Sequence, residues 1–245
     1  MKIFIGIDDT DNLETRGTGF HARSLGMSLM EAGLFEQHSV TRHQLLADRR
    51  IPFTSHNSSA CLAGESNAET GLLVSHCRDF LMLESAFDAD AGLCIASGEN
   101  IPGEIMEFGY RAKKEILTLE DAQSLATKHS IYLDGFLNTR IGMIGSLAAV
   151  GLRAAGNDGR LLWTKNLRET VGIYNAGDYR KHTGIECIIE RTGKDVPDDA
   201  ILEITEWCRP VMRNGHITLI VEKTETSQTY EYISASKEFI KSISE

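Results

Sequence analysis

The chain begins MKIFIGIDDTDNLETRGTGFHARSLG (residues 1–26), and this stretch decides how the chain starts to fold. Its apolar run at residues 3–7 contains β-branched and aromatic side chains and predicts a short buried strand. A group of acids ends this strand within four positions: Asp8, Asp9 and Asp11. A turn with Gly17 and Gly19 follows and leads into apolar residues at helical spacing, which predicts a helix.

The composition bounds the class of protein. The 245 residues, 42% of them hydrophobic, suffice for one large domain or two small ones. The 35 acids and 25 bases give a net charge of −10, which disfavours a broad nucleic-acid surface. No run of about 20 apolar residues predicts a membrane span, and the residues after Lys2 lack a signal-peptide pattern. We therefore expect a cytoplasmic chain without a membrane partner.

The five cysteines are scattered along the chain and form no C-x-x-C pair, which argues against a zinc ribbon. We expect them to be reduced thiols that act mostly as small core residues. They are Cys61, Cys77, Cys94, Cys187 and Cys208.

The pattern of elements predicts an α/β (α+β) chain with two lobes. The first lobe, residues 1–175, is expected to contain a mixed sheet with helices, including strands at 38–46, 70–76 and 91–97 and helices at 78–85, 103–117 and 138–156. The second lobe, residues 176–245, is expected to be ferredoxin-like, because strands at 183–190, 215–223 and 229–234 alternate with helices at 198–212 and 237–243. Thr118 followed by Asp121 predicts the start of one further helix. The antiparallel edge of the second lobe could support a homo-oligomer.

Clustered carboxylates at the end of a strand repel one another unless a cation lies between them. Magnesium prefers such hard oxygen ligands and often combines one or two carboxylates with phosphate oxygens. The Gly17–Gly19 turn precedes a helix N-terminus, which favours a phosphate. The alternative from the residues alone is a plain turn, with Asp11 and Asn12 forming an Asx turn.

Four segments resemble the archaeal tRNA-isoleucine agmatinylcytidine synthetase family. GIDDTD is similar to its N-terminal signature, and RIGMIGSLAAVG (residues 140–151) to its G-R-G-x-I-G-A-L-A-A-I-G signature. DADAGLCIA (residues 88–96) and FGYRAKKEILTLEDAQSLATKHSI (residues 108–131) are similar to segments between them. The resemblance therefore covers roughly residues 3 to 151.

The resemblance implies a kinase-like domain that uses ATP and magnesium. It implies that Asp8, Asp9 and Asp11 hold the metal, and that Asp8, Asp9 and Arg140 take part in catalysis. The nucleotide would contact a further set of residues: Asp11, Gly17, Thr18, Gly19, Gly142 and Gly145. Tight packing of a helix on a sheet is the alternative for Gly142 and Gly145, and a surface ion pair is the alternative for Arg140.

The chain also departs from the family. Phe20 and His21 stand where the family has two threonines, one of them its phosphoacceptor, and Thr54 and His56 replace a lysine and an arginine. The family's oligonucleotide-binding barrel and zinc ribbon have no counterpart in the sequence. We therefore expect weak or no tRNA binding by the isolated chain.

Several polar residues have two interpretations. His21 and His56 suit proton transfer, or a helix start and a polar surface loop, respectively. Lys113 and Lys114 could reach a phosphate or form a solvated face. The basic window at residues 41–50 could bind an anion. Trp163 and Trp207 are expected to be core or interface anchors.

The sequence thus predicts a Mg-ATP-dependent phosphotransferase or ligase, related to tRNA modification, whose acceptor the sequence does not identify. Two alternatives stay open: a nucleotide-binding sensor or partner subunit without turnover, and a tRNA-modifying enzyme that depends on a separate RNA-binding partner.

Overall fold

The computed structural model describes residues 1–54, 56–99, 101–224 and 229–244. The chain divides into two compact units, unit 1 at Met1–Ala155 and unit 2 at Gly156–Glu245. The boundary lies earlier than the sequence analysis placed it, at residues 175 and 176. The reason is that strands β6 (Arg160–Thr164) and β7 (Gly172–Asn175) pair with β10 and β9 of unit 2.

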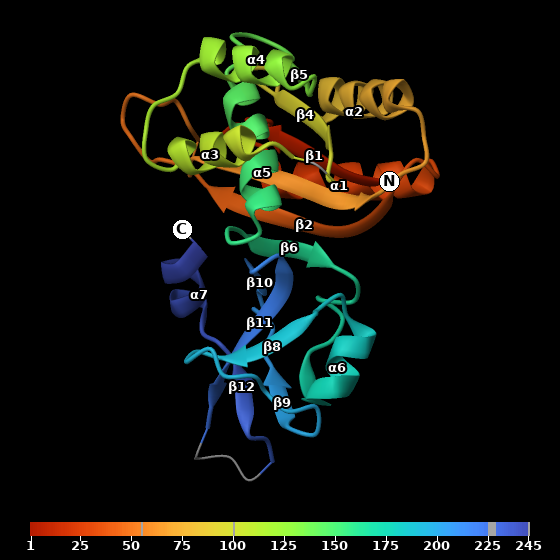
Figure 1. Ribbon diagram of the computed structural model, residues 1–245, viewed down its shortest axis with the longest axis vertical. Coiled ribbons are helices and arrows are strands. Elements are labelled where there is room, and N and C mark those ends of the chain that lie inside the picture. The colour runs from red at the N-terminus through yellow and green to blue at the C-terminus, as the bar shows by residue number, and fades with distance from the viewer. Residues whose placement is uncertain (55, 100, 225–228, 245) are drawn as a thin grey trace. The chain divides into compact units, whose positions relative to one another are not determined.

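Unit 1 contains a sheet with the strand order β5-β4-β1-β3-β2 (Figure 1). The strands are β1 (Lys2–Asp8), β2 (Glu36–Gln44), β3 (Ser58–Glu65), β4 (Gly92–Ser97) and β5 (Tyr132–Gly135). All four pairings in this order are antiparallel. The buried residues 3–7 of β1 confirm the predicted first strand, which lies in the middle of the sheet.

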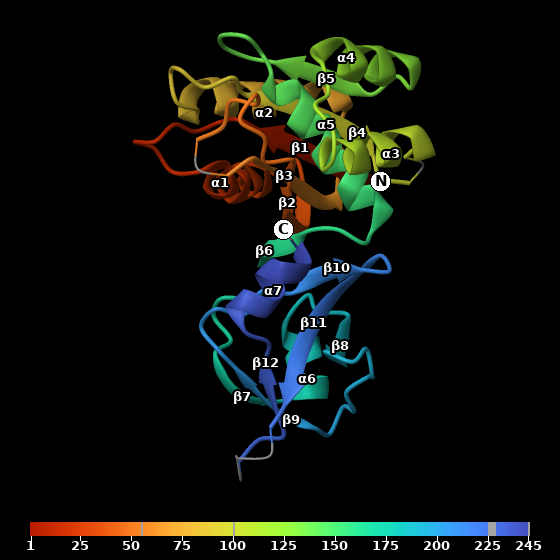
Figure 2. The ribbon, with the colours of Figure 1, turned by 90° about the vertical axis from the view of Figure 1, so that its left-hand side faces the viewer.

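Helices cover both faces of this sheet (Figures 1 and 2). One face packs against α1 (Thr18–Glu31), with α2 (Thr70–Glu84) beside it, and the other packs against α5 (Gly142–Ala155). Two further helices, α3 (Gly103–Ala112) and α4 (Leu119–Lys128), pack on α5. One hydrophobic core of unit 1 lies on the α5 face, around Phe4, Cys61, Cys94, Phe108 and Leu147.

Glycines allow α5 to approach the sheet closely. A methyl group on Gly6 of β1 would overlap the carbonyl of Ser146, and one on Gly92 of β4 would overlap the backbone of Gly142. The first turns of α5 therefore lie directly on the strand ends that carry the acids. This packing explains why a glycine stands at position 142. It agrees with tight helix packing, which the sequence analysis gave as the alternative to ligand contact.

The predicted start of α4 is confirmed. The Thr118 hydroxyl accepts the backbone N–H of Asp121 at 3.1 Å, and the Asp121 carboxylate accepts the backbone N–H of Thr118 at 2.9 Å. The two residues form a capping box.

Unit 2 contains both parallel and antiparallel pairs. Its strands run in the order β6-β10-β11-β12-β9-β7, with β8 pairing β11 in parallel. The strands not yet bounded are β8 (Cys187–Glu190), β9 (Ile201–Ile204), β10 (Val211–Arg213), β11 (His216–Lys223) and β12 (Tyr232–Ser234). The helices are α6 (Ala176–His182) and α7 (Lys237–Ser244). The α+β class predicted from the sequence is confirmed.

Two predicted elements of this fold are wrong. Residues 198–212 form no helix but contain β9 and β10, so the order of elements in unit 2 is not the predicted ferredoxin-like one. In β9 the burial alternates with a period of two, and Pro210 is incompatible with a helix interior. Residues 70–76 belong to helix α2, in which Leu73, Cys77 and Leu81 are buried at a spacing of four while Leu72 is exposed.

All five cysteines are free, and all except Cys187 are buried, in agreement with the expected reduced core thiols. Across the described part of the chain, no helix combines the length and apolar character needed to span a bilayer.

Candidate functional site

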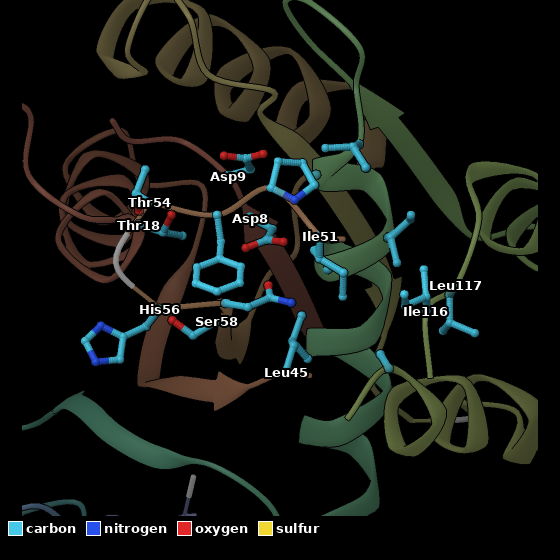
Figure 3. A pocket seen from close by; sticks show the side chains of 18 of the residues that line it. Asp8, Asp9, Thr18, Leu45, Ile51, Thr54, His56, Ser58, Ile116 and Leu117 are labelled. Atoms are coloured by element: carbon cyan, nitrogen blue, oxygen red, sulfur yellow. The ribbon is translucent and has the colours of Figure 1, made fainter. Parts of the chain in front are cut away.

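The site lies at the end of β1, where the backbone turns sharply. Asp8 is the last residue of the strand, and Asp9 adopts a left-handed conformation with φ of 52°. Aspartate and asparagine tolerate this region better than most residues other than glycine. The turn separates the two neighbouring carboxylates so that each faces a different part of the strand end, as Figure 3 shows.

The Asp8 carboxylate lies against the first turn of α5. A Cβ on Gly145 would overlap Oδ2 of Asp8, and one on Gly142 would lie 2.9 Å from the Asp8 carbonyl oxygen. Gly145 is therefore needed to leave room for the carboxylate. The helix start also places backbone dipoles beside a negative charge, which is a favourable arrangement.

The two carboxylates at the strand end are hard to ionise together. Burial, followed by the charge of Asp9, raises the pKa of Asp8 well above its usual range. Burial, followed by the charges of Asp90, Asp11 and Asp88, raises the pKa of Asp9 to about 6. A cation at this position would relieve both effects.

Asp11 has a different environment. Its Oδ1 accepts hydrogen bonds from the Thr18 hydroxyl at 2.6 Å and the Thr18 N–H at 2.9 Å, and its Oδ2 accepts the Thr54 hydroxyl at 3.1 Å. Gly17 occupies the N-cap position of α1 and has no side chain to satisfy the helix N–H groups. Asp11 therefore caps α1 from outside the helix.

A chain of hydrogen bonds connects Asp11 to His21. Thr18 donates to Asp11 and accepts the hydroxyl of Thr10 at 3.2 Å, while Nδ1 of His21 lies 2.8 Å from that Thr10 hydroxyl. With the Thr10 proton directed at Thr18, Nδ1 of His21 is the donor to Thr10. His21 is buried, and burial lowers its pKa, so the ring is kept neutral in this buried network. This arrangement supports a structural role for His21.

A cavity of about 110 Å³ opens beside the acids. Figure 3 shows the Asp8 carboxylate among the side chains that line it, with Asp9 at the edge. An apolar wall of the cavity comes from three segments of unit 1: Leu45, Ile51, Ile116, Leu117, Ile141 and Ile144. The cavity thus combines a carboxylate end with a wall suited to a flat or aliphatic ligand group.

A second cavity of about 250 Å³ lies at the entrance to α1 and shares Asp11, Thr18 and Thr54 with the first. Gly17 and Gly19 line it together with Arg23 and Arg42. Phe20, which stands in place of a family threonine, contacts two arginines, with the guanidinium carbons of Arg16 and Arg23 at 4.4 and 5.8 Å from its ring centre. Arginine side chains are therefore present at the Gly17–Gly19 turn. They stand at other sequence positions than the lysine and arginine of the resembled family, which Thr54 and His56 replace.

The residues described in the structure hold no group of three or more His, Cys, Asp or Glu side chains arranged to bind a metal ion by themselves. The predicted set of Asp8, Asp9 and Asp11 thus does not form a complete protein-only metal site. Because Asp11 binds Thr18 and Thr54, two carboxylates are left for a cation. This number fits magnesium, which usually completes its shell with water and phosphate oxygens.

Two acids that the sequence analysis did not assign also lie at this strand end. Asp90 accepts the backbone N–H of Arg140 at 3.0 Å and that of Thr139 through the same oxygen, and Asp88 accepts the side-chain amide of Asn12 at 2.8 Å. Both acids raise the pKa of Asp9. The antiparallel pairing of Asp8 with Gly92 brings the segment before β4 next to the end of β1.

Arg140 lies apart from the cavities. Its side chain is exposed, its backbone has a left-handed φ of 63°, and it does not line either cavity. No ion pair of Arg140 is found among the described residues, so the alternative of a surface ion pair is not seen.

Of the other candidates, His56 lines both cavities. Trp207 packs against the core of unit 2, in line with a core role. In the basic window at residues 41–50, Arg50 pairs with Asp48 at 2.8 Å, while Arg42 lines the second cavity.

Comparison with known proteins gives a partial match. No family model matches the chain. An uncharacterized protein of Methanocaldococcus jannaschii, MJ0921, is 28% identical over 154 residues, which are 62% of this chain and 50% of that protein. The chain therefore spans about half the length of this curated relative.

Solved structures of TiaS, an isoleucine-tRNA agmatidine synthetase, share the fold of part of the chain. The complex of TiaS with its tRNA and ATP superposes with a TM-score of 0.56 at 24% identity, covering 62% of this chain and 36% of TiaS. Apo TiaS gives a TM-score of 0.54 at 23% identity over 62% of this chain and 35% of TiaS. The predicted likeness is thus confirmed as a likeness of fold: this chain contains a region folded like about a third of the agmatidine synthetase TiaS.

Proposed function

We propose that unit 1 binds ATP with magnesium and transfers or activates a phosphoryl group in a reaction related to tRNA modification. The observation that carries the proposal is the pair of carboxylates of Asp8 and Asp9 beside a cavity, both with raised pKa values. Such a pair is costly without a cation and becomes favourable with one.

ATP is the proposed nucleotide because solved structures of TiaS, which shares the fold of unit 1, contain ATP or AMPCPP. Structures of TiaS include a complex with tRNA and ATP and a complex with tRNA, AMPCPP and agmatine. Each covers 62% of this chain. We carry over the nucleotide and leave the acceptor open, because the likeness extends to only about a third of TiaS.

In this proposal, Asp8 and Asp9 hold the metal, which when bound neutralises charge on the phosphates. The Gly19 N–H, for which the described residues offer no acceptor, lies in the first turn of α1 at the second cavity and is available to a phosphate oxygen. Asp11 keeps this turn in place through Thr18. The apolar wall beside Asp8 excludes water from one side of the ligand.

The experiment is a calorimetric titration with ATP, with and without magnesium, on the wild type and on the variants Asp8→Asn and Asp9→Asn. Asparagine keeps the size of the side chain and, at position 9, tolerates the left-handed backbone. The matched control is Asp79→Asn, an exposed acid on α2. We expect magnesium-dependent binding in the wild type and the control, and its loss in both site variants.

Equal affinity in all four proteins would contradict the proposal and return the acids to a role in the turn. ATP hydrolysis by the same preparations separates an enzyme from the alternative of a nucleotide-binding sensor or partner subunit. Magnesium-dependent binding with slow hydrolysis supports the enzyme, whereas binding without any turnover supports the sensor.

A further inference from the structure

Unit 2 brings three arginines together, although the whole chain has a net charge of −10. Arg160 of β6 pairs with Val211 of β10, and the neighbouring Leu161 N–H donates to the carbonyl of Pro210 at 2.8 Å. Because Arg209 directly precedes Pro210, these two contacts place Arg160 and Arg209 on adjacent segments.

The third arginine, Arg168, lies in the loop after β6, and its side chain contacts the backbone of β6. The guanidinium of Arg168 donates to the carbonyl of Leu162 at 3.3 Å, two residues along β6 from Arg160. Arg168 is exposed, while Arg160 and Arg209 are partly buried. We call Arg160, Arg168 and Arg209 the arginine cluster.

Among the described residues, no carboxylate neutralises Arg168 or Arg209, since neither of them forms an ion pair there. The carboxylate of Glu169 accepts the backbone N–H of Arg168 at 3.1 Å rather than its guanidinium, and Arg209 donates to the carbonyl of Cys208 at 2.7 Å. Burial, followed by the charge of Arg168, lowers the pKa of Arg209, which is the effect of like charges in proximity.

An aromatic ring and a further cation extend the arginine cluster. The guanidinium carbon of Arg209 lies 5.3 Å from the centre of a Trp207 ring, and Nζ of Lys237 lies 6.0 Å from it. Trp207 packs against the core formed with Val211 and Ile240, so the ring is a fixed support for both cations. Two positive charges are thereby held on one aromatic side chain.

We propose that the arginine cluster, with Trp207 and Lys237, binds the phosphodiester backbone of single-stranded RNA. Arginine forks match phosphate oxygens, and guanidinium planes stack on unpaired bases. The like charges of Arg168 and Arg209, which no carboxylate among the described residues neutralises, cost free energy in the free protein, and a polyanion removes that cost. An acidic peptide would pair with the positive charge of the arginine cluster but has no bases to stack on the guanidinium planes. This inference concerns unit 2 and does not depend on the proposed function of unit 1.

The test uses the full chain and a fluorescently labelled single-stranded RNA of about 15 nucleotides, followed by anisotropy from low to moderate salt. The variant is Arg168→Gln with Arg209→Gln. The control is Arg78→Gln with Arg213→Gln, which removes the same charge from two exposed arginines outside the arginine cluster. Circular dichroism melting checks the fold, and Arg168→Gln alone, at an exposed side chain, keeps the test valid if the double variant unfolds.

We expect the cluster variant to bind RNA about tenfold more weakly and to lose about 1.4 from the salt slope, since each phosphate contact to a single strand contributes about 0.7. The control variant should change affinity less than about twofold. Equal losses in both variants, or no RNA binding by the wild type at low salt, would overturn the proposal. So would equally effective competition by polyglutamate, which would assign the surface to an acidic protein.

Discussion

The hydroxyl of Thr18 donates a hydrogen bond of 2.6 Å to the carboxylate of Asp11, seven residues earlier in the chain. The same carboxylate oxygen accepts the backbone N–H of Thr18 at 2.9 Å. This relationship divides the acids at the end of β1 into two kinds. Asp11 supports the start of α1, whereas the carboxylates of Asp8 and Asp9 form no ion pair among the described residues and have raised pKa values.

Replacing Asp11 by alanine should therefore destabilise the protein. Loss of a capping side chain costs about 1–2 kcal/mol, and asparagine, which caps as well as aspartate, should lose less. Urea denaturation of Asp11→Ala, Asp11→Asn and the wild type measures this difference. An Asp11→Ala protein as stable as the wild type would show that the hydrogen bonds to Thr18 contribute nothing.

Asp9→Asn should act in the opposite direction. The native pKa of Asp9 is about 6, against 3.8 for an unperturbed side chain, so the native state binds more protons than the unfolded state between these pH values. The free energy of unfolding therefore falls as the pH rises from about 4 to about 6 and stays lower above that. Asparagine removes this loss and should stabilise the protein at pH 7.5 by about 1–2 kcal/mol, less than the full shift implies because Asp9 is partly solvated.

Denaturation of the wild type, Asp9→Asn and the control Asp79→Asn from pH 4 to pH 8 checks this expectation. The decrease in stability between pH 4 and pH 6 should be smaller in Asp9→Asn and unchanged in the control. A decrease of the same size in all three proteins would mean that the Asp9 carboxylate titrates normally.

Gly145→Ala should disturb the site through Asp8. The added methyl group would overlap the Asp8 carboxylate, which must move for α5 to stay packed on the sheet. We expect a loss of magnesium-dependent ATP binding together with reduced stability. Gly71→Ala on α2 is the control, since a Cβ there meets nothing within 4 Å and should stabilise the helix by up to about 1 kcal/mol. Unaltered ATP binding by Gly145→Ala would separate this glycine from the site.

The isolated chain should bind tRNA weakly at ordinary salt, with a dissociation constant in the non-specific range of about 10⁻⁴–10⁻⁶ M. The acidic net charge of −10 opposes a broad RNA surface, and the arginine cluster is small. A filter-binding assay measures this affinity. Tight binding, well below the micromolar range, would show that the chain recognises tRNA without a partner.

Strong periodicity made most of the fold of unit 1 predictable from the sequence. The buried run of β1, the Thr118 capping box and the helical spacing of α1 and α5 all indicated their structures correctly. The strand β3, SSACLAGE, was missed because its small residues give no β-branched signal. The neighbouring strand β1 provides the large side chains at this place in the sheet, since Phe4 pairs with Ala63 and Ile5 with Leu62.

The candidate site was predictable only in part. The motif near residue 8 indicated Asp8, Asp9 and Asp11, yet Asp88 and Asp90 depend on the pairing of β1 with β4, which no local pattern contains. The separate role of Asp11 depends on hydroxyl contacts from Thr18 and Thr54, which are likewise tertiary. Arg140 was inferred from a motif, and in the fold its exposed side chain lies outside both cavities.

The central position of β1 has a consequence for biosynthesis. It precedes both of its neighbours in the sheet along the chain, and these neighbours begin only at Ser58 and Gly92. Until those strands emerge, the apolar segment at residues 3–7 has both edges unpaired, and such segments are prone to aggregate. Charges that flank an apolar strand oppose this association. We expect the carboxylates after β1 to protect the nascent chain during the interval before the sheet forms.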